Sequence, residues 1–330
     1  MSRNAKITAS GFYAPDRVIP NSWFNDLLGE DVDSWLRDNV QIFERRWCAE
    51  NESTADLVEH ACKDALQTSG LKPEDIDLLI VATDTPEYIS PSTASVIQHR
   101  MGFKNAGTFD INTACAGFVT ALDTGSKFIQ ADRQYNKVLV VGAYAMSKYL
   151  NLKDKKTVTL FADGAGAVIL EATDDSDTGF LQSKLITKGE YYDYMGIYAG
   201  GTHCLVTPER IAAHEHQLQF VKKIPKEVNP EVWSDLIVDI CHKSGISPDE
   251  VDHFFFTQIN INSIRETMDR LNLDFGKAAT IMNYYGYTGS ACIPMAFDRW
   301  MKAGKVKKGD YVLFIGSGGG LAFGIALFKM

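Results

Sequence analysis

The sequence predicts an α/β protein made of two duplicated halves, each rich in βαβ units and packed in layers. The chain has 330 residues, which is more than one average domain needs. Short, continuously apolar runs alternate with amphipathic helical stretches, a pattern typical of sheets covered by helices on both faces. The segment 69–77 recurs as 244–252, an offset of 175 residues, which indicates an internal repeat.

The first half gives its elements in a regular order. An amphipathic helix is expected from Ala55 onward, followed by the turn 69–77 and an apolar strand at 78–81. A second strand at 108–112 leads into another helix, and a further apolar strand follows at 137–142.

The second half repeats these elements at nearly constant spacing. A helix from Ser234 precedes the repeated turn, and the apolar run 254–256 follows it. The other matches are Thr113 with Thr288, Ala121 with Ala296, Asp123 with Asp298, and 137–142 with 311–316. We therefore divide the chain into 1–175 and 176–330, joined near the polar stretch 174–177.

Two such halves related by a pseudo-twofold axis would bury one helix from each half at the centre. The helix after Cys115 and the helix after Thr288 form the natural central pair. This arrangement places residues 287–292 beside Cys115, so we expect a site formed between the two halves.

Cys115 is the main candidate for a catalytic residue, because it lies where a strand-like run gives way to a helix. The first turn of a helix has unpaired backbone N–H groups and the positive end of the helix dipole, and both favour thiolate over thiol. Small neighbours leave room for a substrate to reach the sulfur. The alternative is a buried cysteine that serves as a small apolar side chain, the commoner role of a free cysteine.

Composition excludes several classes of function. The net charge is −9, and the chain has no basic block or basic-aromatic stripe typical of nucleic-acid binding. The six cysteines lack CxxC spacing, which favours reduced thiols over disulfides or a metal site. Because the sequence shows neither a signal peptide nor an apolar run of membrane-spanning length, we expect a soluble, cytoplasmic protein with no membrane partner.

Two glycine-rich segments match nucleotide-binding motifs only in part. The segment 316–320 follows a strand but lacks the Lys-Ser/Thr pair of a phosphate-binding loop, and 163–166 lacks the third glycine of a dinucleotide fingerprint. We expect the first to allow close backbone approach to a reacting carbonyl, and we expect no nicotinamide cofactor.

The chain resembles the β-ketoacyl-acyl-carrier-protein synthase III family along essentially its whole length. The segments that carry the resemblance are 114–118 (Ala-Cys-Ala-Gly-Phe), 161–167 and the glycine-rich 316–324. The resemblance implies a thiolase fold with αβαβα layers, a homodimer and no permanently bound cofactor. In that family the substrate is a coenzyme A thioester. The cysteine takes the acyl group from coenzyme A and passes it to malonyl on acyl carrier protein as carbon dioxide leaves.

The same resemblance implies roles for individual residues. Cys115 matches the acylated nucleophile, and the backbone N–H groups of Cys115 and Gly319 match the oxyanion hole. Trp35 matches a residue that stacks on the adenine of coenzyme A. The loop 87–91 is similar to one that reaches across the dimer to close the neighbour's acyl pocket.

Basic residues would suit the phosphate of coenzyme A or the acidic face of a carrier protein. We assign Lys155 and Lys156 to coenzyme A binding, together with Asn260, which matches the asparagine of the family's His-Gln-Ala-Asn segment. A solvated surface is the ordinary alternative for these lysines and for the rest of the basic rim, namely Lys153, Lys222, Lys223, Lys226, Arg265 and Arg270.

Two positions depart from the family pattern. Thr257 stands where relatives carry the histidine of that segment, and Tyr287 stands where they carry asparagine in Gly-Asn-Thr. In relatives this pair binds the malonyl thioester carbonyl and stabilises the enolate, whereas Thr257 and Tyr287 each offer one hydroxyl donor. We place both in the acceptor site. We expect Cys115 to accept an acyl group, while malonyl decarboxylation is slow, uses a different donor set, or is replaced by transfer to another nucleophile.

No other histidine is a clear replacement. His253 is expected at a strand edge or on the surface, and His214 and His216 lie on different sides of a predicted helix, which argues against a metal pair. His203 lies in a loop that relatives place near the acyl pocket, and it is the remaining candidate.

Three functions stay open. The leading one is an acyltransferase of the synthase III type. The second is a transferase that forms an ester or amide without decarboxylation. The third is a non-catalytic partner subunit of a condensing-enzyme complex, and retention of Cys115 argues against it.

Overall fold

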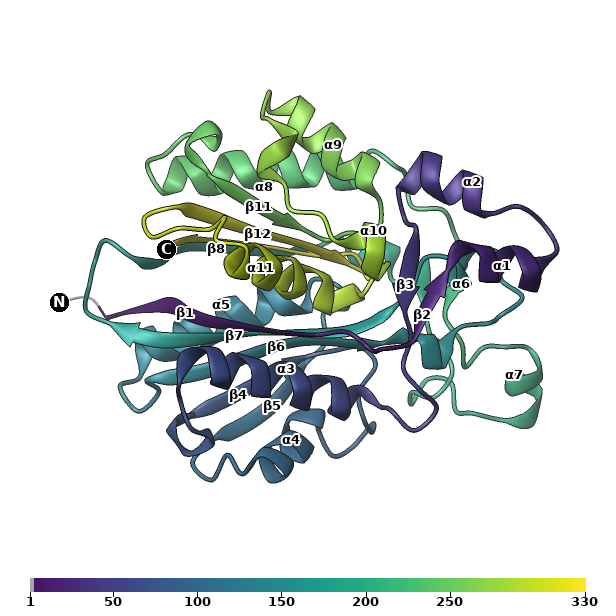
Figure 1. The fold of residues 1–330 in the computed structure, drawn as a ribbon, viewed down its shortest axis with the longest axis horizontal. Helices are drawn as coiled ribbons and strands as arrows, with labels where there is room; N and C mark the ends of the chain where they lie inside the picture. Colours follow the sequence, from purple (N-terminus) through teal and green to yellow (C-terminus); the bar gives the residue numbers. More distant parts are fainter. Residues whose placement is uncertain (1–2) are drawn as a thin grey trace.

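The computed structural model describes residues 3–330, and its first sheet has five strands in the order β1-β7-β6-β4-β5 (Figure 1). β4 pairs in parallel with β5 and β6, and β7 runs antiparallel between β1 and β6. The bounds are β1 (Asn4–Tyr13), β4 (Leu78–Ala82), β5 (Gly107–Ile111), β6 (Lys137–Ala145) and β7 (Asp163–Thr173).

The second sheet has four strands in the order β11-β12-β13-β8. β11 and β12 are parallel, whereas β13 is antiparallel to both of its neighbours. The bounds are β8 (Gly179–Thr187), β11 (His253–Phe256), β12 (Tyr311–Gly318) and β13 (Ala322–Lys329). Two short ladders pair β2 (Val18–Pro20) with β3 (Glu44–Arg46), and β9 (Met195–Gly196) with β10 (Gln219–Phe220).

Helices form three layers around the two sheets, as Figure 1 shows. The outer layers are α3 (Thr54–Ser69) with α4 (Thr93–Met101), and α8 (Val228–Lys243) with α9 (Ile261–Arg270). The central layer is α5 (Gly117–Ala131) with α11 (Cys292–Lys302). The predicted αβαβα arrangement and central helix pair are confirmed.

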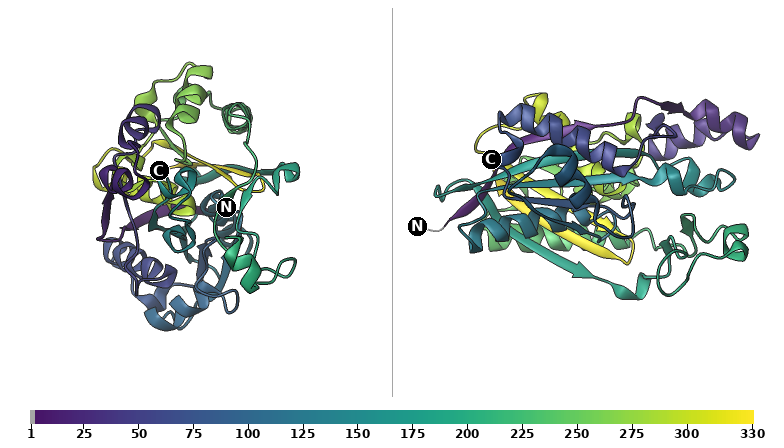
Figure 2. Two further views of the ribbon diagram at one scale, coloured as in Figure 1. Left: turned by 90° about the vertical axis from the view of Figure 1, so that its right-hand side faces the viewer. Right: turned by 90° about the horizontal axis from the view of Figure 1, so that it is seen from below.

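Short helices gather at the end of the molecule away from both termini (Figure 1). Figure 2 shows this end from two further directions, with the purple α1 and the green α7 far apart in its right panel. The helices at this end are α1 (Asn21–Leu28), α2 (Asp33–Trp35), α6 (Lys155–Val158) and α7 (Pro208–Ala212), and α10 (Met282–Tyr285) precedes the turn at residues 286–291. Within residues 3–330, no helix combines the length and apolar character needed to cross a bilayer.

The internal repeat corresponds to matching elements. Both 73–75 and 248–250 form a 3-10 turn, closed in each case by a 2.8 Å hydrogen bond from the preceding N–H, of Lys72 or Ser247, to the carboxylate of Asp75 or Glu250. Strands β1-β7-β6-β4 follow the same spatial order as β8-β13-β12-β11. β5 has no strand counterpart, because the equivalent residues form α10. The division into 1–175 and 176–330 remains a prediction; it agrees with the strand content of the two sheets.

Candidate functional site

Cys115 lies in a tight turn between β5 and α5. The turn needs a left-handed residue, and Ala114 supplies it with φ +47°. The backbone of β12 packs directly on this turn, since a Cβ atom on Gly318 would lie 2.5 Å from the Cys115 amide nitrogen. Glycine is therefore required where the second half of the chain meets the nucleophile.

Tyr287 is the nearest partner of the sulfur. Its hydroxyl donates a hydrogen bond to the Cys115 side chain. The buried Tyr287 is fixed by its backbone, which bonds Leu160 at 2.9 Å and Ala162 at 2.8 Å, and by its contact with the Phe161 ring, at 5.3 Å between centroids. The predicted proximity of residues 287–292 to Cys115 is confirmed.

The predicted thiolate character of Cys115 is wrong for this structure. Burial raises the pKa of Cys115 well above its ordinary value, and the nearby Asp84 carboxylate raises it further. The hydrogen bond from Tyr287 lowers the pKa but does not offset the loss of solvent. The side chain is 1% exposed, so the predicted accessibility of the thiol is also wrong. The positive end of the α5 dipole therefore does not lower the pKa of Cys115 enough to offset the effect of burial.

Two backbone N–H groups flank the sulfur without partners. Within residues 3–330, neither the Cys115 nor the Gly319 N–H donates to another residue. The two lie close together, because Gly318 packs on the Cys115 nitrogen and Gly319 approaches Ala114. Such a donor pair suits a developing oxyanion.

Thr257 is buried beside this turn, but its hydroxyl is engaged. The oxygen accepts from the Ser317 N–H at 2.9 Å and donates to the Ser317 carbonyl at 3.3 Å. The predicted role as a hydrogen-bond donor to an acceptor substrate is therefore not supported, since Thr257 has no free proton.

A cleft opens at the end of the molecule where the short helices gather. Its volume of about 740 Å³ is typical of sites that bind small molecules. It brings together Trp35, which is 55% exposed, and Lys155 and Lys156 from α6. Lys222 and Lys223 line it as well, so four lysines surround one hollow in an acidic protein. Asn260 is not among the lining residues; its side chain caps α9 by accepting from the Asn262 N–H.

The inner wall of the cleft adjoins the Cys115 site. Leu160 and Phe220 line the cleft, and Leu160 accepts the backbone hydrogen bond of Tyr287. Phe161 contacts both Phe220 and Tyr287, at 5.8 and 5.3 Å between ring centroids. The rings of Phe220, Phe161 and Tyr287 thus form an aromatic layer between the cleft and the sulfur.

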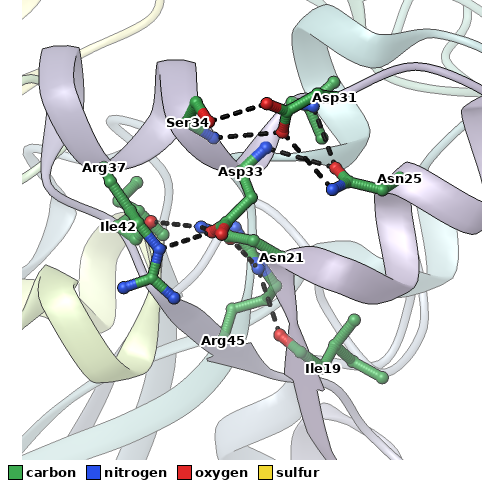
Figure 3. Close-up of polar contacts among 10 residues, drawn as sticks. Ile19, Asn21, Asn25, Asp31, Asp33, Ser34, Arg37, Ile42 and Arg45 are labelled. Carbon is green, nitrogen blue, oxygen red and sulfur yellow. Dashed lines mark hydrogen bonds and ion pairs between the residues drawn. The ribbon is translucent and has the colours of Figure 1, made fainter.

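A buried arginine, Arg45, connects α2 to Thr159, a residue that lines the cleft. Figure 3 shows its contacts with Ile19 and Asn21. Arg45 donates to the carbonyls of Ile19 at 3.0 Å and Thr159 at 2.6 Å, and to the Asn21 side chain at 2.7 Å. Asn21 in turn donates to Asp33 in α2 at 2.8 Å. Burial lowers the pKa of Arg45 to about 9. No sequence pattern indicated this network.

The histidines lie elsewhere. His253 bonds Asp310 at 2.8 Å, in agreement with its predicted structural role, and His214 bonds Gln217 at 2.9 Å. Within residues 3–330, no histidine, lysine or arginine is among the main causes of the shift in the Cys115 pKa. The sequence also missed Asp84, a carboxylate beside the thiol, since a lone aspartate after a strand carries no motif.

Comparisons with known proteins agree with this geometry. Residues 109–189 match the family model of 3-oxoacyl-[acyl-carrier-protein (ACP)] synthase III, and residues 241–330 match that of its C-terminal part. A β-ketoacyl-[acyl-carrier-protein] synthase III of Clostridium perfringens is 36% identical over 99% of this chain and 100% of the relative. One from Clostridioides difficile is 33% identical over 100% and 99%, respectively.

A solved structure gives the same result. The crystal structure of 3-oxoacyl-[acyl-carrier-protein] synthase III from Aquifex aeolicus superposes with a TM-score of 0.87 at 31% identity. The match covers 99% of this chain and 100% of that one.

Proposed function

Because the chain belongs to the 3-oxoacyl-[acyl-carrier-protein] synthase III family, we propose that Cys115 takes an acyl group from a coenzyme A thioester and passes it to an acceptor, by default malonyl on acyl carrier protein. Family membership makes the chain an acyltransferase of fatty acid biosynthesis. The observation that carries the role of Cys115 is the hydrogen bond from Tyr287 to a sulfur flanked by two N–H groups that donate to no other residue.

In the first half reaction, the thioester lies with its nucleotide in the lysine-lined cleft and its reactive end toward Tyr287. The Cys115 sulfur attacks the carbonyl carbon as its proton leaves. The Cys115 and Gly319 N–H groups stabilise the oxyanion, and the bond to the coenzyme A sulfur breaks. Since the aromatic layer covers the sulfur, Phe161 or Tyr287 must shift when the substrate enters.

We propose that the acceptor step differs from that of the family, as the resemblance implies for Thr257 and Tyr287. Thr257 is engaged with Ser317, and the Tyr287 hydroxyl is engaged with the sulfur in the free protein. A thioester sulfur accepts hydrogen bonds poorly, so acylation of Cys115 releases the Tyr287 hydroxyl toward the acceptor. We propose that this chain offers one hydrogen-bond donor to the malonyl thioester where relatives offer two. Malonyl decarboxylation is therefore expected to be slow.

The test is intact-mass analysis after exposure to a panel of acyl-coenzyme A thioesters. An adduct on the wild-type protein that is missing from Cys115→Ala supports the proposal. Carbon dioxide release from labelled malonyl carrier protein, at a rate typical of the family, would contradict the slow second step. In the double variant Thr257→His with Tyr287→Asn, release is expected to increase.

The covered sulfur gives weight to a second candidate, the non-catalytic partner subunit. Inertness toward every thioester would favour it. Transfer of the acyl group to an alcohol or amine, without carbon dioxide release, would favour the ester- or amide-forming enzyme instead.

We also propose a cytoplasmic homodimer. The loop 87–91 supports the dimer, because Tyr88 and Ile89 are 54% and 87% exposed in the single chain and would be covered by a partner. Sedimentation velocity tests the dimer, and a protein that stays monomeric at micromolar concentration contradicts it.

A further inference from the structure

Asp84 lies at the carboxyl end of β4, between β5 and β6. Ala82, the last residue of β4, pairs with Ile111 of β5 and Gly142 of β6. The chain leaves β5 toward Cys115, and β6 carries Tyr144 just beyond Gly142. The carboxyl ends of parallel strands form one edge, where open α/β sheets bind their ligands. Asp84 therefore shares that edge with the thiol.

The Asp84 carboxylate lacks the partners of a structural acid. Its Oδ1 is buried, and nothing in residues 3–330 forms a hydrogen bond with it. Asp163, another buried acid, instead accepts from the N–H groups of Cys48 at 2.7 Å and Ser147 at 2.8 Å. The carboxylate has a hydrogen bond from the Asp84 backbone N–H. A buried oxygen without a partner costs stability, so a purely structural role does not explain Asp84.

The charge of Asp84 acts on the groups that face it. These are Cys115, Tyr144 and Tyr149, and the carboxylate raises the pKa of each. Burial raises the pKa of Asp84 itself to about 6, and no cation within residues 3–330 offsets the shift. A group of this acidity is ionised at neutral pH and can accept a proton. Cys115 needs such a group, because burial keeps its proton in place.

We propose that Asp84 is the general base for acylation of Cys115, an inference that rests on the proposed function. As the sulfur bonds to the acyl carbonyl carbon, the thiol proton passes to the Asp84 carboxylate, directly or through one water. The tetrahedral intermediate then collapses and the bond to the coenzyme A sulfur breaks. That sulfur leaves with the proton from Asp84, which restores the carboxylate.

Asp84→Asn separates this role from a purely electrostatic one. The variant keeps the shape of the side chain but cannot accept the proton, so acylation at pH 8 is expected to fall by about 10²-fold or more. The rate of wild-type acylation is expected to fall below about pH 6, as the Asp84 carboxylate becomes protonated, and this dependence is expected to disappear in the variant. Alkylation by iodoacetamide is expected to accelerate, because loss of a neighbouring negative charge favours the Cys115 thiolate.

Two further variants and one measurement complete the test. Asp84→Glu keeps an acid and is expected to retain part of the acylation rate, whereas Asp84→Ala is expected to lose it. Thermal unfolding at pH 8 should show Asp84→Asn at least as stable as wild type. Acylation of Asp84→Asn at or above the wild-type rate would overturn the base role alone. A wild-type protein that no thioester acylates would overturn the proposed function as well.

Discussion

At the scale of single residues, the chemistry depends on the surroundings of one sulfur atom. Burial and Asp84 raise the pKa of Cys115, whereas the Tyr287 hydroxyl and the Cys115 backbone N–H lower it by less. The resting protein therefore holds a thiol. The nucleophile must form when the substrate is in place, which limits side reactions of a free thiolate.

Tyr287→Phe removes only the hydroxyl that donates to Cys115. It is expected to raise the pKa of Cys115 further and to slow acylation by about 10-fold or more, because a hydrogen bond to a charged group contributes about 1.5–3 kcal/mol. The rate of iodoacetamide alkylation should shift to higher pH. Tyr284→Phe changes an exposed ring, 58% accessible, and serves as the control. An unchanged pH profile in Tyr287→Phe would contradict the assignment.

Gly318→Ala tests the contact between the two halves of the chain. The new Cβ would lie 2.5 Å from the Cys115 nitrogen and 2.7 Å from the Thr113 carbonyl oxygen, and neither backbone atom can move freely. We expect a loss of about 1–3 kcal/mol in the free energy of unfolding, measured with urea, and impaired acylation. Gly201→Ala is the matched control, since no atom lies within 4 Å of its added Cβ.

The sequence predicted which residues meet at the site better than it predicted their chemistry. The internal repeat places Cys115 and Tyr287 at the molecular centre, and the structure agrees. The direction in which the Cys115 pKa shifts depends on how completely β12 and the aromatic rings cover the sulfur. No local sequence pattern reveals the extent of this cover. The engagement of Thr257 depends on the β11–β12 register, where Phe256 pairs with Ile315.

At the scale of elements, the long apolar strands and their covering helices were predictable, because each run has the period of a buried element. The short elements α1, α2 and α6 were not, since they bury few apolar residues. Of these elements, α2 and α6 supply Trp35, Lys155 and Lys156 to the wall of the cleft. The resemblance to a family assigned Trp35 to coenzyme A binding, and the charge argument assigned Lys155; no local pattern indicated that the two residues share one cleft.

Arg45→Met tests how the cleft wall is held. The change leaves the Asn21 side chain and the carbonyls of Ile19 and Thr159 without their donor. We expect a loss of about 3–5 kcal/mol in the free energy of unfolding, typical of a broken buried polar network. Binding of coenzyme A, measured by calorimetry, is expected to weaken at temperatures where the variant is folded. Arg37→Met removes an arginine that is 51% exposed and should cost about 1 kcal/mol or less.

At the scale of the whole molecule, five layers leave little room for charge inside. The acidic chain, with net charge −9, gathers four lysines at one cleft. Five of its cysteines are buried, and burial raises the pKa of each: Cys48, Cys62, Cys115, Cys241 and Cys292. The buried thiols therefore keep their protons at a pH where the thiols of an unfolded chain would ionise.

This difference in thiol ionisation between the folded and unfolded chain makes the free energy of unfolding depend on pH in the alkaline range. Unfolded thiols ionise above a pKa of about 8.5, whereas the folded protein keeps their protons, so the free energy of unfolding falls as pH rises. Each buried thiol contributes a loss of about 2 kcal/mol by pH 10. Cys62→Ala should therefore lose about 2 kcal/mol less than wild type between pH 8 and pH 10 in urea titrations. Cys204→Ala, at a partly exposed position, should follow wild type. Equal losses in wild type and Cys62→Ala would show that the folded interior admits ionised thiols.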